Sequence, residues 1–282
     1  MTYLQALFLG LLQGVSELFP ISSLGHTVIV PSIVHMKIDQ HDPSFLFFIV
    51  ATHFATALVL LGFFWRDWLN IIIGILRSLY LREIRTDDPE AKIGWLLIVS
   101  TIPAGLLGLL FEDKLKLLFT TPFYAALFLI MNGFLLFGAE NLRKLRSNHS
   151  ITEGDPRLAR LTWLQALSIG AMQCLALLPG FSRTGATLSG GLLVGLSHGD
   201  AARYSFLLAT PIIFAAAILK IPQLAMSANI STIIGPILVG VISSAIGAYV
   251  SVRFLTKYFH TQTLTPFAIY CVLGGGLALL LI

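Results

Sequence analysis

The chain has 282 residues, of which 56% are hydrophobic and only 11% are charged, and its mean hydropathy is +0.85. A soluble globular domain carries about 25% charged residues, so this composition excludes an ordinary water-soluble enzyme and a disordered regulator. The net charge of +4 does not indicate a nucleic-acid ligand, because the basic residues lie in short clusters between apolar segments, where they set membrane orientation. The composition predicts an integral membrane protein.

The N-terminal segment reads as the start of a mature membrane protein. Its first charged residue is Glu17, so it has no basic region before the apolar residues and we expect no cleavable signal peptide. Segments 2–16 and 24–36 are apolar but short, or broken by Gly and Pro. Because irregular backbone at membrane depth requires surrounding protein or a wet cavity, these segments predict a re-entrant helical hairpin beside a site.

Uncharged segments further along predict membrane-spanning helices, several of them near the twenty or so residues that a span needs. They are 43–65, 93–111, 117–139, 161–182, 204–219, 221–252 and 258–282. His53, inside the first of these segments, is interpreted as a core or span residue.

Three basic clusters predict the orientation of the spans. The clusters are loop 82–92, loop 140–160 and the pair Arg253 and Lys257. Placing all three in the cytoplasm satisfies the positive-inside rule. The acidic tip around Asp39 then lies outside.

The chain contains an internal repeat. The 24 residues from Leu4 and the 24 from Leu164 align without gaps, and ten positions are identical. The alignment predicts a first repeat over 1–139, a basic cytoplasmic linker over 140–160 and a second repeat over 161–282, all in one membrane domain. Repeats of opposite orientation build a site at their interface near the middle of the membrane. An ancestral duplication without function at the matching bends is the alternative.

Two rare charged residues lie at corresponding bends of the repeats. Glu17 is the only charged residue before Lys37, and Arg183 is the only one between Arg160 and Asp200. An ionisable group at membrane depth is costly, and it is retained when it pairs, binds a ligand or reacts. A purely structural Glu17–Arg183 ion pair is one interpretation.

The residues around these bends favour a phosphate ligand. In 19–27 and in 179–187, Pro and Gly break a helix and residues rich in Ser and Thr lead into the next one. A helix start presents unpaired N–H groups and a partial positive charge. Together with hydroxyl groups and the Arg183 guanidinium, such a start forms an anion receptor.

Phosphate chemistry suggests roles for four residues of the first bend. Glu17 is a candidate ligand of a divalent cation or a general base, and Gln13, one helical turn earlier, is a tentative second metal ligand. His26 is a candidate nucleophile or acid–base group. Ser23 is a second candidate nucleophile, and the sequence does not choose between it and His26.

These motifs resemble the bacterial undecaprenyl-diphosphate phosphatases, also called bacitracin-resistance proteins. The family's first motif is an acid or Gln, three residues, Glu, and then Pro-x-Ser-Ser-x-Gly-His, which is matched from Gln13 to His26. Its second, Pro-Gly-x-Ser-Arg-Ser/Thr-Gly-x-Thr, is matched from Pro179 to Thr187. Many members have Glu where Gln13 stands, which weakens a metal role for this position. Further similar segments, 64–66, 205–209 and 266–270, extend the resemblance over nearly the whole chain.

The resemblance implies a fold and an activity. The fold is an all-α inverted-repeat bundle with about six transmembrane helices and two re-entrant helical pairs. The activity is hydrolysis of undecaprenyl diphosphate to undecaprenyl phosphate and inorganic phosphate, which recycles the lipid carrier for peptidoglycan synthesis and confers bacitracin resistance. Carried onto matching positions, the functional residues are Glu17, Ser23, His26, Ser182, Arg183 and Thr187, with Gln13 as a supplement.

The expected mechanism combines anion binding with phosphoryl transfer. The phosphate ligands are expected to be Arg183, Ser182, Thr187 and Ser22. Glu17 is expected to place Mg²⁺ or Ca²⁺ against the diphosphate. His26 or Ser23 then attacks the terminal phosphorus, or His26 activates water.

The resemblance also implies the substrate, the partners and the location of the protein. The substrate is a polyprenyl diphosphate lipid, membrane lipids enclose the protein, no nucleic acid is bound, and a homodimer is left open. The active site is expected to face the extracytoplasmic side of the bacterial inner membrane. A transporter or flippase of the polyprenyl phosphate carrier is the alternative, and it needs no nucleophile.

Overall fold

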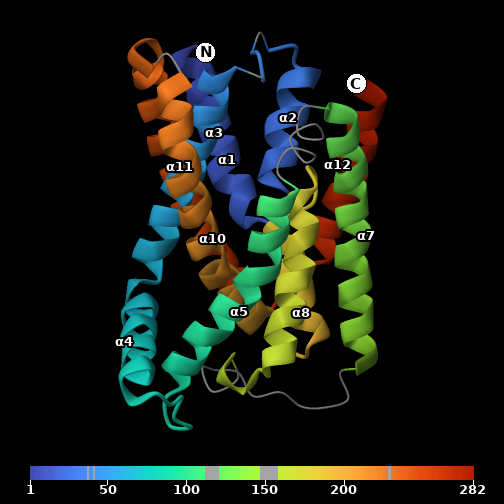
Figure 1. Ribbon diagram of the computed structural model, residues 1–282. Helices are drawn as coiled ribbons and strands as arrows, with labels where there is room; N and C mark the ends of the chain where they lie inside the picture. Colours follow the sequence, from blue (N-terminus) through green and yellow to red (C-terminus); the bar gives the residue numbers. More distant parts are fainter. Residues whose placement is uncertain (37, 41, 112–120, 147–157, 228–229) are drawn as a thin grey trace.

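The fold is that of an all-α integral membrane protein. We describe it from a computed structural model, which covers residues 1–282 apart from 37, 41, 112–120, 147–157 and 228–229 (Figure 1). The described residues form helices joined by turns and loops, without a β-strand. Large apolar side chains face outward on several helices, for example Leu110 and Leu280. Such a surface is expected where lipid surrounds the helices.

Five helices in the described part of the chain are long and apolar enough to cross a membrane. They are α3 (Pro43–Phe63), α5 (Pro89–Leu110), α7 (Pro122–Arg146), α10 (His198–Ser227) and α11 (Ile230–Tyr258). A further apolar helix, α12 (Thr265–Leu281), has 17 residues, which is at the lower end of the range for a span. The prediction of about six spans corresponds to these five helices and the shorter α12.

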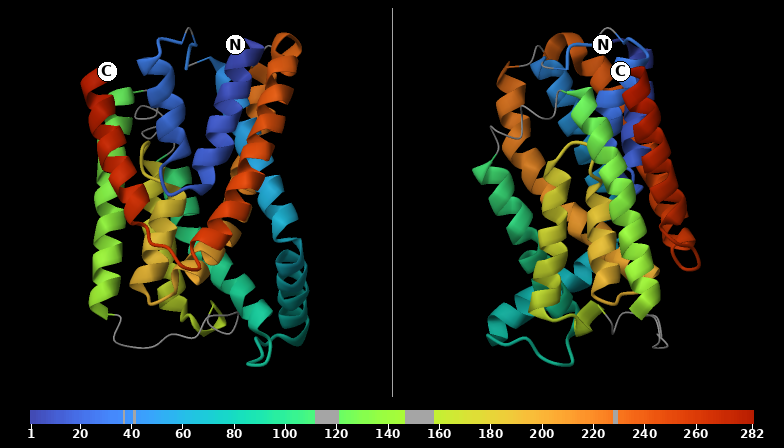
Figure 2. Two further views of the ribbon diagram at one scale, coloured as in Figure 1. Left: turned by 180° about the vertical axis from the view of Figure 1, so that it is seen from behind. Right: turned by 90° about the vertical axis from the view of Figure 1, so that its right-hand side faces the viewer.

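Two helical hairpins enter the bundle and turn back near its middle. The first consists of α1 (Tyr3–Leu18) and α2 (Ser23–Ile33), and the second of α8 (Trp163–Gln173), the 3-10 helix η2 (Cys174–Leu177) and α9 (Arg183–Leu193). The first comes from the end of the molecule that holds both termini, and the second comes from the opposite end (Figures 1 and 2).

The prediction that segment 161–182 spans the membrane is wrong. Segment 161–182 does not cross the bundle but forms the entering half of the second hairpin. The helical segment ends at Leu177 because Pro179 disfavours a helical residue before it and Gly180 adopts a φ of 103°. A Cβ at Gly180 would also overlap the backbone of Ala125 in α7.

Equivalent residues begin the two hairpins in the same way. Thr2 and Gln5 cap α1 reciprocally, since each side chain bonds the backbone of the other. Thr162 and Gln165, which are 160 residues later, form the same capping box at the start of α8. The internal repeat of the sequence is thus repeated in local structure.

Each hairpin packs against a long helix from the other half of the chain. α1 lies along α11, and α8 lies along α5. A Cβ at Gly14 would overlap the backbone of Ser244 in α11, and a Cβ at Gly170 would overlap the backbone of Ser100 in α5. Small residues therefore allow the close helix contacts that are common in membranes. This exchange of partners is what inverted repeats predict.

The boundaries of the repeats stay predictions. Most of the proposed linker 140–160 lies outside the described residues, apart from the end of α7 and the short helix η1 (Leu158–Arg160) that leads to α8. α4 (Trp65–Leu81), which lies between the helices α3 and α5 of the first half, has no equivalent among the described helices of the second.

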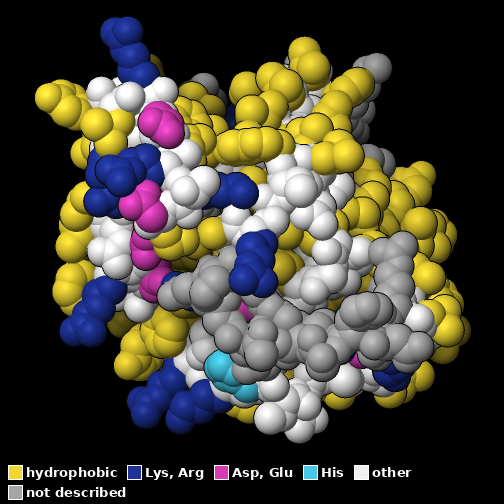
Figure 3. All heavy atoms as spheres, turned by 90° about the horizontal axis from the view of Figure 1, so that it is seen from below, with side chains coloured by type: hydrophobic (Ala, Val, Ile, Leu, Met, Phe, Trp, Pro, Cys, Tyr) yellow, Lys and Arg dark blue, Asp and Glu magenta, His cyan; other side chains and the backbone are white. Residues whose placement is uncertain are grey.

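The end of the molecule opposite the termini is basic. It carries α4, loop 82–92 and the C-terminal end of α7 (Figure 1), and Figure 3 shows Lys and Arg side chains over this face. Arg77 of α4 pairs with Asp88 at 2.6 Å, and Asp88 in turn caps α5 by accepting a hydrogen bond from the Ala91 N–H at 3.1 Å. An ion pair between Asp67 and Arg203 joins α4 to α10.

Candidate active site

The bends of the two hairpins meet in the middle of the molecule and are bonded to each other. The Thr184 hydroxyl donates to the Glu17 carbonyl oxygen at 3.0 Å, and the Ser182 hydroxyl donates to the Phe19 carbonyl oxygen at 3.3 Å. These bonds satisfy backbone groups that the broken helices leave open, as irregular backbone at membrane depth requires. They also fix the distance between the residues that follow each bend.

Asn132 of α7 holds both bends from one side. Its Nδ2 donates to the Pro20 carbonyl oxygen at 2.9 Å, and its Oδ1 accepts from the Ser182 N–H at 3.1 Å. The residue is fully buried. Our sequence interpretation missed Asn132, although an uncharged polar residue in the apolar segment 117–139 is a weak signal of such a role.

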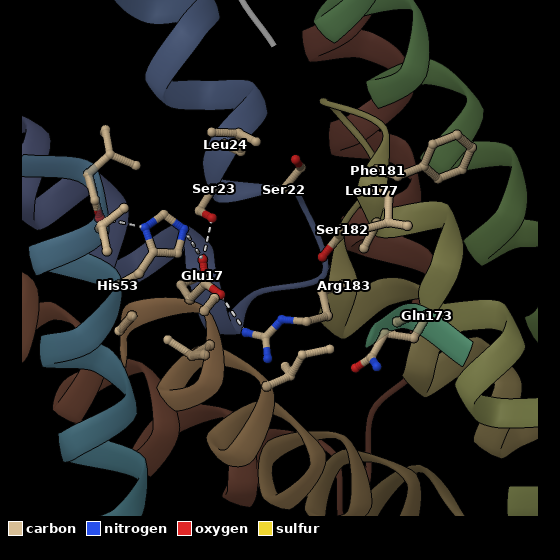
Figure 4. Close-up of a pocket in the computed structure, with 18 of the residues that line it drawn as sticks. Glu17, Ser22, Ser23, Leu24, His53, Gln173, Leu177, Phe181, Ser182 and Arg183 are labelled. Atoms are coloured by element: carbon tan, nitrogen blue, oxygen red, sulfur yellow. Dashed lines mark hydrogen bonds and ion pairs between the residues drawn. The ribbon is translucent and has the colours of Figure 1, made fainter. Parts of the chain in front are cut away.

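The Glu17 carboxylate is the centre of the site. Its Oε1 accepts a hydrogen bond from Arg183, and its Oε2 accepts one from the Ser23 hydroxyl. His53 Nε2 lies 3.2 Å from the same Oε2 (Figure 4). Four helices, α1, α2, α3 and α9, thus bring a cation, a hydroxyl and an imidazole within hydrogen-bond distance of one carboxylate.

The hydrogen bonds of His53 place a proton beside Glu17. Its Nδ1 lies 2.8 Å from the Ile49 carbonyl oxygen, which can only accept, so Nδ1 carries a hydrogen. Its Nε2 faces a carboxylate oxygen, which requires a hydrogen between these two atoms as well. A hydrogen therefore lies between His53 Nε2 and Glu17 Oε2.

The sequence predicts that His53 is a core or span residue, and its position in a span is confirmed, but its contact with the site was missed. It is the eleventh of the 21 residues of α3, the middle of a predicted span. An ionisable residue at that depth carries the same signal that singled out Glu17 and Arg183. A core residue would contact only apolar neighbours, whereas His53 contacts the Glu17 carboxylate.

A cavity of about 420 Å³ opens beside these residues. Of the predicted site residues, those that line it are Glu17, Ser22, Ser23, Ser182 and Arg183. Its remaining wall is mostly apolar and comes from α3, α5, η2 and α10, including Ile49, Ala104 and Ala216. From the bends it continues along α10 to Lys220, toward the end of the molecule that holds the termini.

Three of the predicted site residues do not line this cavity. His26 has both ring nitrogens engaged elsewhere, Nδ1 with the Ser22 carbonyl oxygen at 2.6 Å and Nε2 with the Tyr270 hydroxyl of α12 at 2.8 Å. The Thr187 hydroxyl donates to the Arg183 carbonyl oxygen at 2.9 Å. Gln13 is fully buried within α1. Of the two candidate nucleophiles, Ser23 is therefore the one that faces the cavity.

The side chains of the cavity do not fit a divalent cation held by protein ligands. Glu17 is the single carboxylate in its wall, and Arg183, His53 and Ser23 already contact its oxygens. The described residues contain no group of three or more His, Cys, Asp or Glu that could hold a metal ion. Mg²⁺ and Ca²⁺ require several oxygen ligands, and the Arg183 guanidinium beside Glu17 opposes a further positive charge.

Comparison with known proteins gives the family. The family model described as "Bacitracin resistance protein BacA" matches residues 6–277. The chain belongs to the BacA family. A BacA relative from Mycolicibacterium paratuberculosis, named undecaprenyl-diphosphatase, is 47% identical over 99% of this chain and 97% of its own length. A relative from Chromobacterium violaceum, named undecaprenyl-diphosphatase 2, is 45% identical over 99% of both chains. The names of these BacA relatives denote an enzyme of the hydrolase class.

Proposed function

We propose that the protein hydrolyses undecaprenyl diphosphate to undecaprenyl phosphate and inorganic phosphate, which returns the lipid carrier to peptidoglycan synthesis and confers resistance to bacitracin. The observation that carries this proposal is a serine hydroxyl, Ser23, bonded to the buried Glu17 carboxylate beside Arg183, at the inner end of a largely apolar cavity. The membership of the BacA family supports the same activity.

Binding of the headgroup is expected to rely on Arg183 and on the starts of two helices. The guanidinium offers a planar fork of donors to phosphoryl oxygens. The N-termini of α2 and α9, which both begin at the cavity, add partial positive charge. The apolar part of the wall suits the prenyl tail, whose burial contributes affinity but little to catalysis.

Ser23 is the nucleophile in this proposal. Its oxygen attacks the terminal phosphorus while its proton passes to the Glu17 carboxylate, which His53 orients, and the same proton returns to the Ser23 oxygen when the phosphoserine is hydrolysed. The bond from that phosphorus to the bridging oxygen breaks, and undecaprenyl phosphate leaves with the electron pair. Water then hydrolyses the phosphoserine, which releases inorganic phosphate and restores Ser23. Arg183 stabilises the charge on the phosphoryl oxygens during both steps.

The sequence predicts a divalent cation held by Glu17 and Gln13, whereas in this proposal the cation arrives with the substrate. Because the described residues offer no cluster of free oxygen ligands at the cavity, we expect Mg²⁺ or Ca²⁺ to arrive on the diphosphate oxygens of the substrate. Activity should then depend on the cation in the same way in the wild type and in Gln13→Leu.

The orientation in the membrane is part of the proposal. The cavity continues toward the end with the termini, whereas the basic residues gather at the other end. Under the positive-inside rule this supports a site open to the extracytoplasmic side of the bacterial inner membrane. The homodimer stays a prediction.

The test is phosphate release from undecaprenyl diphosphate by the purified protein in detergent. We expect the wild type and Ser243→Ala to release phosphate, because Ser243 is a buried serine of α11 outside the cavity wall. Ser23→Ala and Arg183→Ala should release none above background. Movement of the lipid across vesicles without phosphate release would instead support the flippase, which needs no nucleophile.

A further inference from the structure

Two buried polar groups in the wall of the cavity lack a partner among the described residues. They are the amide of Gln173, whose residue is 2% exposed, and the Nη1 of Arg183. A buried donor without a partner is destabilising, so such groups are rare in native proteins and call for an explanation. Both residues line the cavity in which the substrate headgroup is expected.

The repeat provides a comparison for Gln173. Its equivalent in the first hairpin, Gln13, is also fully buried, and its amide likewise has no partner in the described part of the chain. Gln13, however, does not line the cavity. An unpartnered amide alone does not indicate a ligand here, but an unpartnered amide in the same cavity wall as an unpartnered guanidinium nitrogen does.

The positions of these groups divide the cavity into two sides. Figure 4 shows Glu17, Ser23 and His53 on one side of Arg183, and Gln173 on the other. The Nη2 of Arg183 is directed to Glu17, where the terminal phosphorus is attacked in the proposed reaction. Gln173 is accompanied in the wall by apolar residues of η2 and α5, such as Ala176 and Ala104, which suit the first part of a lipid tail.

We propose that Gln173 and the Nη1 of Arg183 bind the phosphoryl group that remains on the lipid, and so select a lipid diphosphate. This inference rests on the proposed function, because that function places the terminal phosphoryl group at Ser23. The Gln173 amide donates to a non-bridging oxygen of the inner phosphoryl group, and Arg183 spans the two phosphoryl groups. The Gln173 amide and Arg183 Nη1 thereby stabilise the negative charge that develops on the leaving phosphate.

The experiment measures binding, so that it does not depend on turnover. The probes are farnesyl methylenediphosphonate, a lipid diphosphate analogue that cannot be hydrolysed at the bridge, and inorganic phosphate. Gln173→Met keeps a similar unbranched shape and removes the amide. We expect the dissociation constant of the diphosphonate to rise about tenfold or more, as for loss of a hydrogen bond to a charged group, and that of inorganic phosphate to change less than about twofold.

Two further variants keep the test decisive. Gln173→Glu retains the shape, removes the donors and adds a negative charge, so it should weaken diphosphonate binding more than Gln173→Met does. Gln13→Met removes the equivalent buried amide outside the cavity, and it should leave the ratio of the two dissociation constants as in the wild type. The ratio separates a lost contact from a general loss of packing.

Each outcome decides the inference or the proposed function separately. Wild-type affinity for the diphosphonate in Gln173→Met and Gln173→Glu overturns the inference, and so does an equal weakening of both probes. A wild type that binds the diphosphonate but releases no phosphate from undecaprenyl diphosphate overturns the proposed function, while the binding ratios still decide whether Gln173 contacts the inner phosphoryl group.

Discussion

The two bends have the same construction but different chemistry. Ser22 and Ser182, at equivalent positions, both accept a hydrogen bond from the backbone N–H three residues later, at 3.2 and 3.0 Å. The Thr27 and Thr187 hydroxyls both lie within hydrogen-bond distance of the carbonyl oxygen three residues earlier, at 3.0 and 3.3 Å. The residues that the bends share therefore form helix starts, which any hairpin of this shape needs.

The residues that differ between the bends form the candidate site. Glu17 corresponds to Leu177 in the second bend, and Ser23 corresponds to Arg183. The acid and the hydroxyl come from one repeat and the guanidinium from the other, so neither bend is complete without its partner. The groups that react in the proposed mechanism therefore lie at positions where the two repeats differ.

The largest effect is expected from the residues that differ. Glu17→Gln removes the acceptor of the Ser23 proton while keeping the shape, and should lower the rate of phosphate release about 10²–10⁴-fold. Arg183→Lys keeps the charge but loses the planar fork, and should also fail to restore wild-type activity. Steady-state phosphate release in detergent measures both. Near-normal rates in both variants would contradict the assignment of chemistry to these positions.

A smaller loss is expected at His53, which acts through Glu17. His53→Gln can still donate one hydrogen bond but cannot exchange a proton, so we expect a loss on the order of tenfold in kcat with little change in KM. The pH–rate profile should change shape, because a titrating group has been removed. Asn132→Ser, which alters the bends but not the proton path, is the comparison, and a profile with the wild-type shape in His53→Gln would argue against this role.

The residue that joins the bends should affect stability and activity together. Asn132→Leu leaves the Pro20 carbonyl and the Ser182 N–H unpaired in a buried place, which is expected to cost about 1–3 kcal/mol for each group. Thermal unfolding in detergent should show a lower Tm, and phosphate release should fall because the bends lose their register. Asn132→Ser, whose hydroxyl can bond one of the two groups, should lose less of both.

The shared caps should give smaller and matched effects. Ser22→Ala and Ser182→Ala each remove a helix cap and should destabilise the protein by about 1 kcal/mol, measured as similar shifts in Tm. Both serines also line the cavity, and the sequence predicts that they bind phosphate. A large loss of activity in Ser182→Ala at an unchanged Tm would show that substrate binding, rather than capping, is its main role.

The smallest effect concerns the basic end, far from the bends. Burial raises the pKa of Asp88, but hydrogen bonds from Arg77 and the Ala91 N–H outweigh it, so the pKa lies below its usual range. A depressed pKa means that the folded state favours the carboxylate, so this contribution is present at neutral pH and is lost as the pH falls through the lowered pKa.

The Asp88 prediction is tested by the pH dependence of the Tm. Asp88→Asn keeps a good helix cap but cannot titrate, so its Tm should decrease less than that of the wild type between neutral and acidic pH. If the Tm of both proteins changes with pH in the same way, the Asp88–Arg77 ion pair does not contribute to the pH dependence.

The class of the fold and part of the site, including Glu17 and Arg183, can be predicted from local properties of the chain. Hydropathy predicts an all-α membrane protein, and Pro179 and Gly180 predict a helix break. The rarity of Glu17 and Arg183 marks them as site residues. These signals depend on local sequence alone, because each arises from the cost of placing a single residue or a short segment in lipid.

The other residues of the site are positioned by packing between helices that are distant in sequence. His53 and Asn132 reach the bends from α3 and α7, and no local pattern links them to Glu17. His26 lies only three residues from Ser23, yet contact with Tyr270 of α12 directs its ring away from the cavity. The direction of a side chain in a bundle depends on which helix packs against that face, and this is settled only when segments far apart in sequence come together.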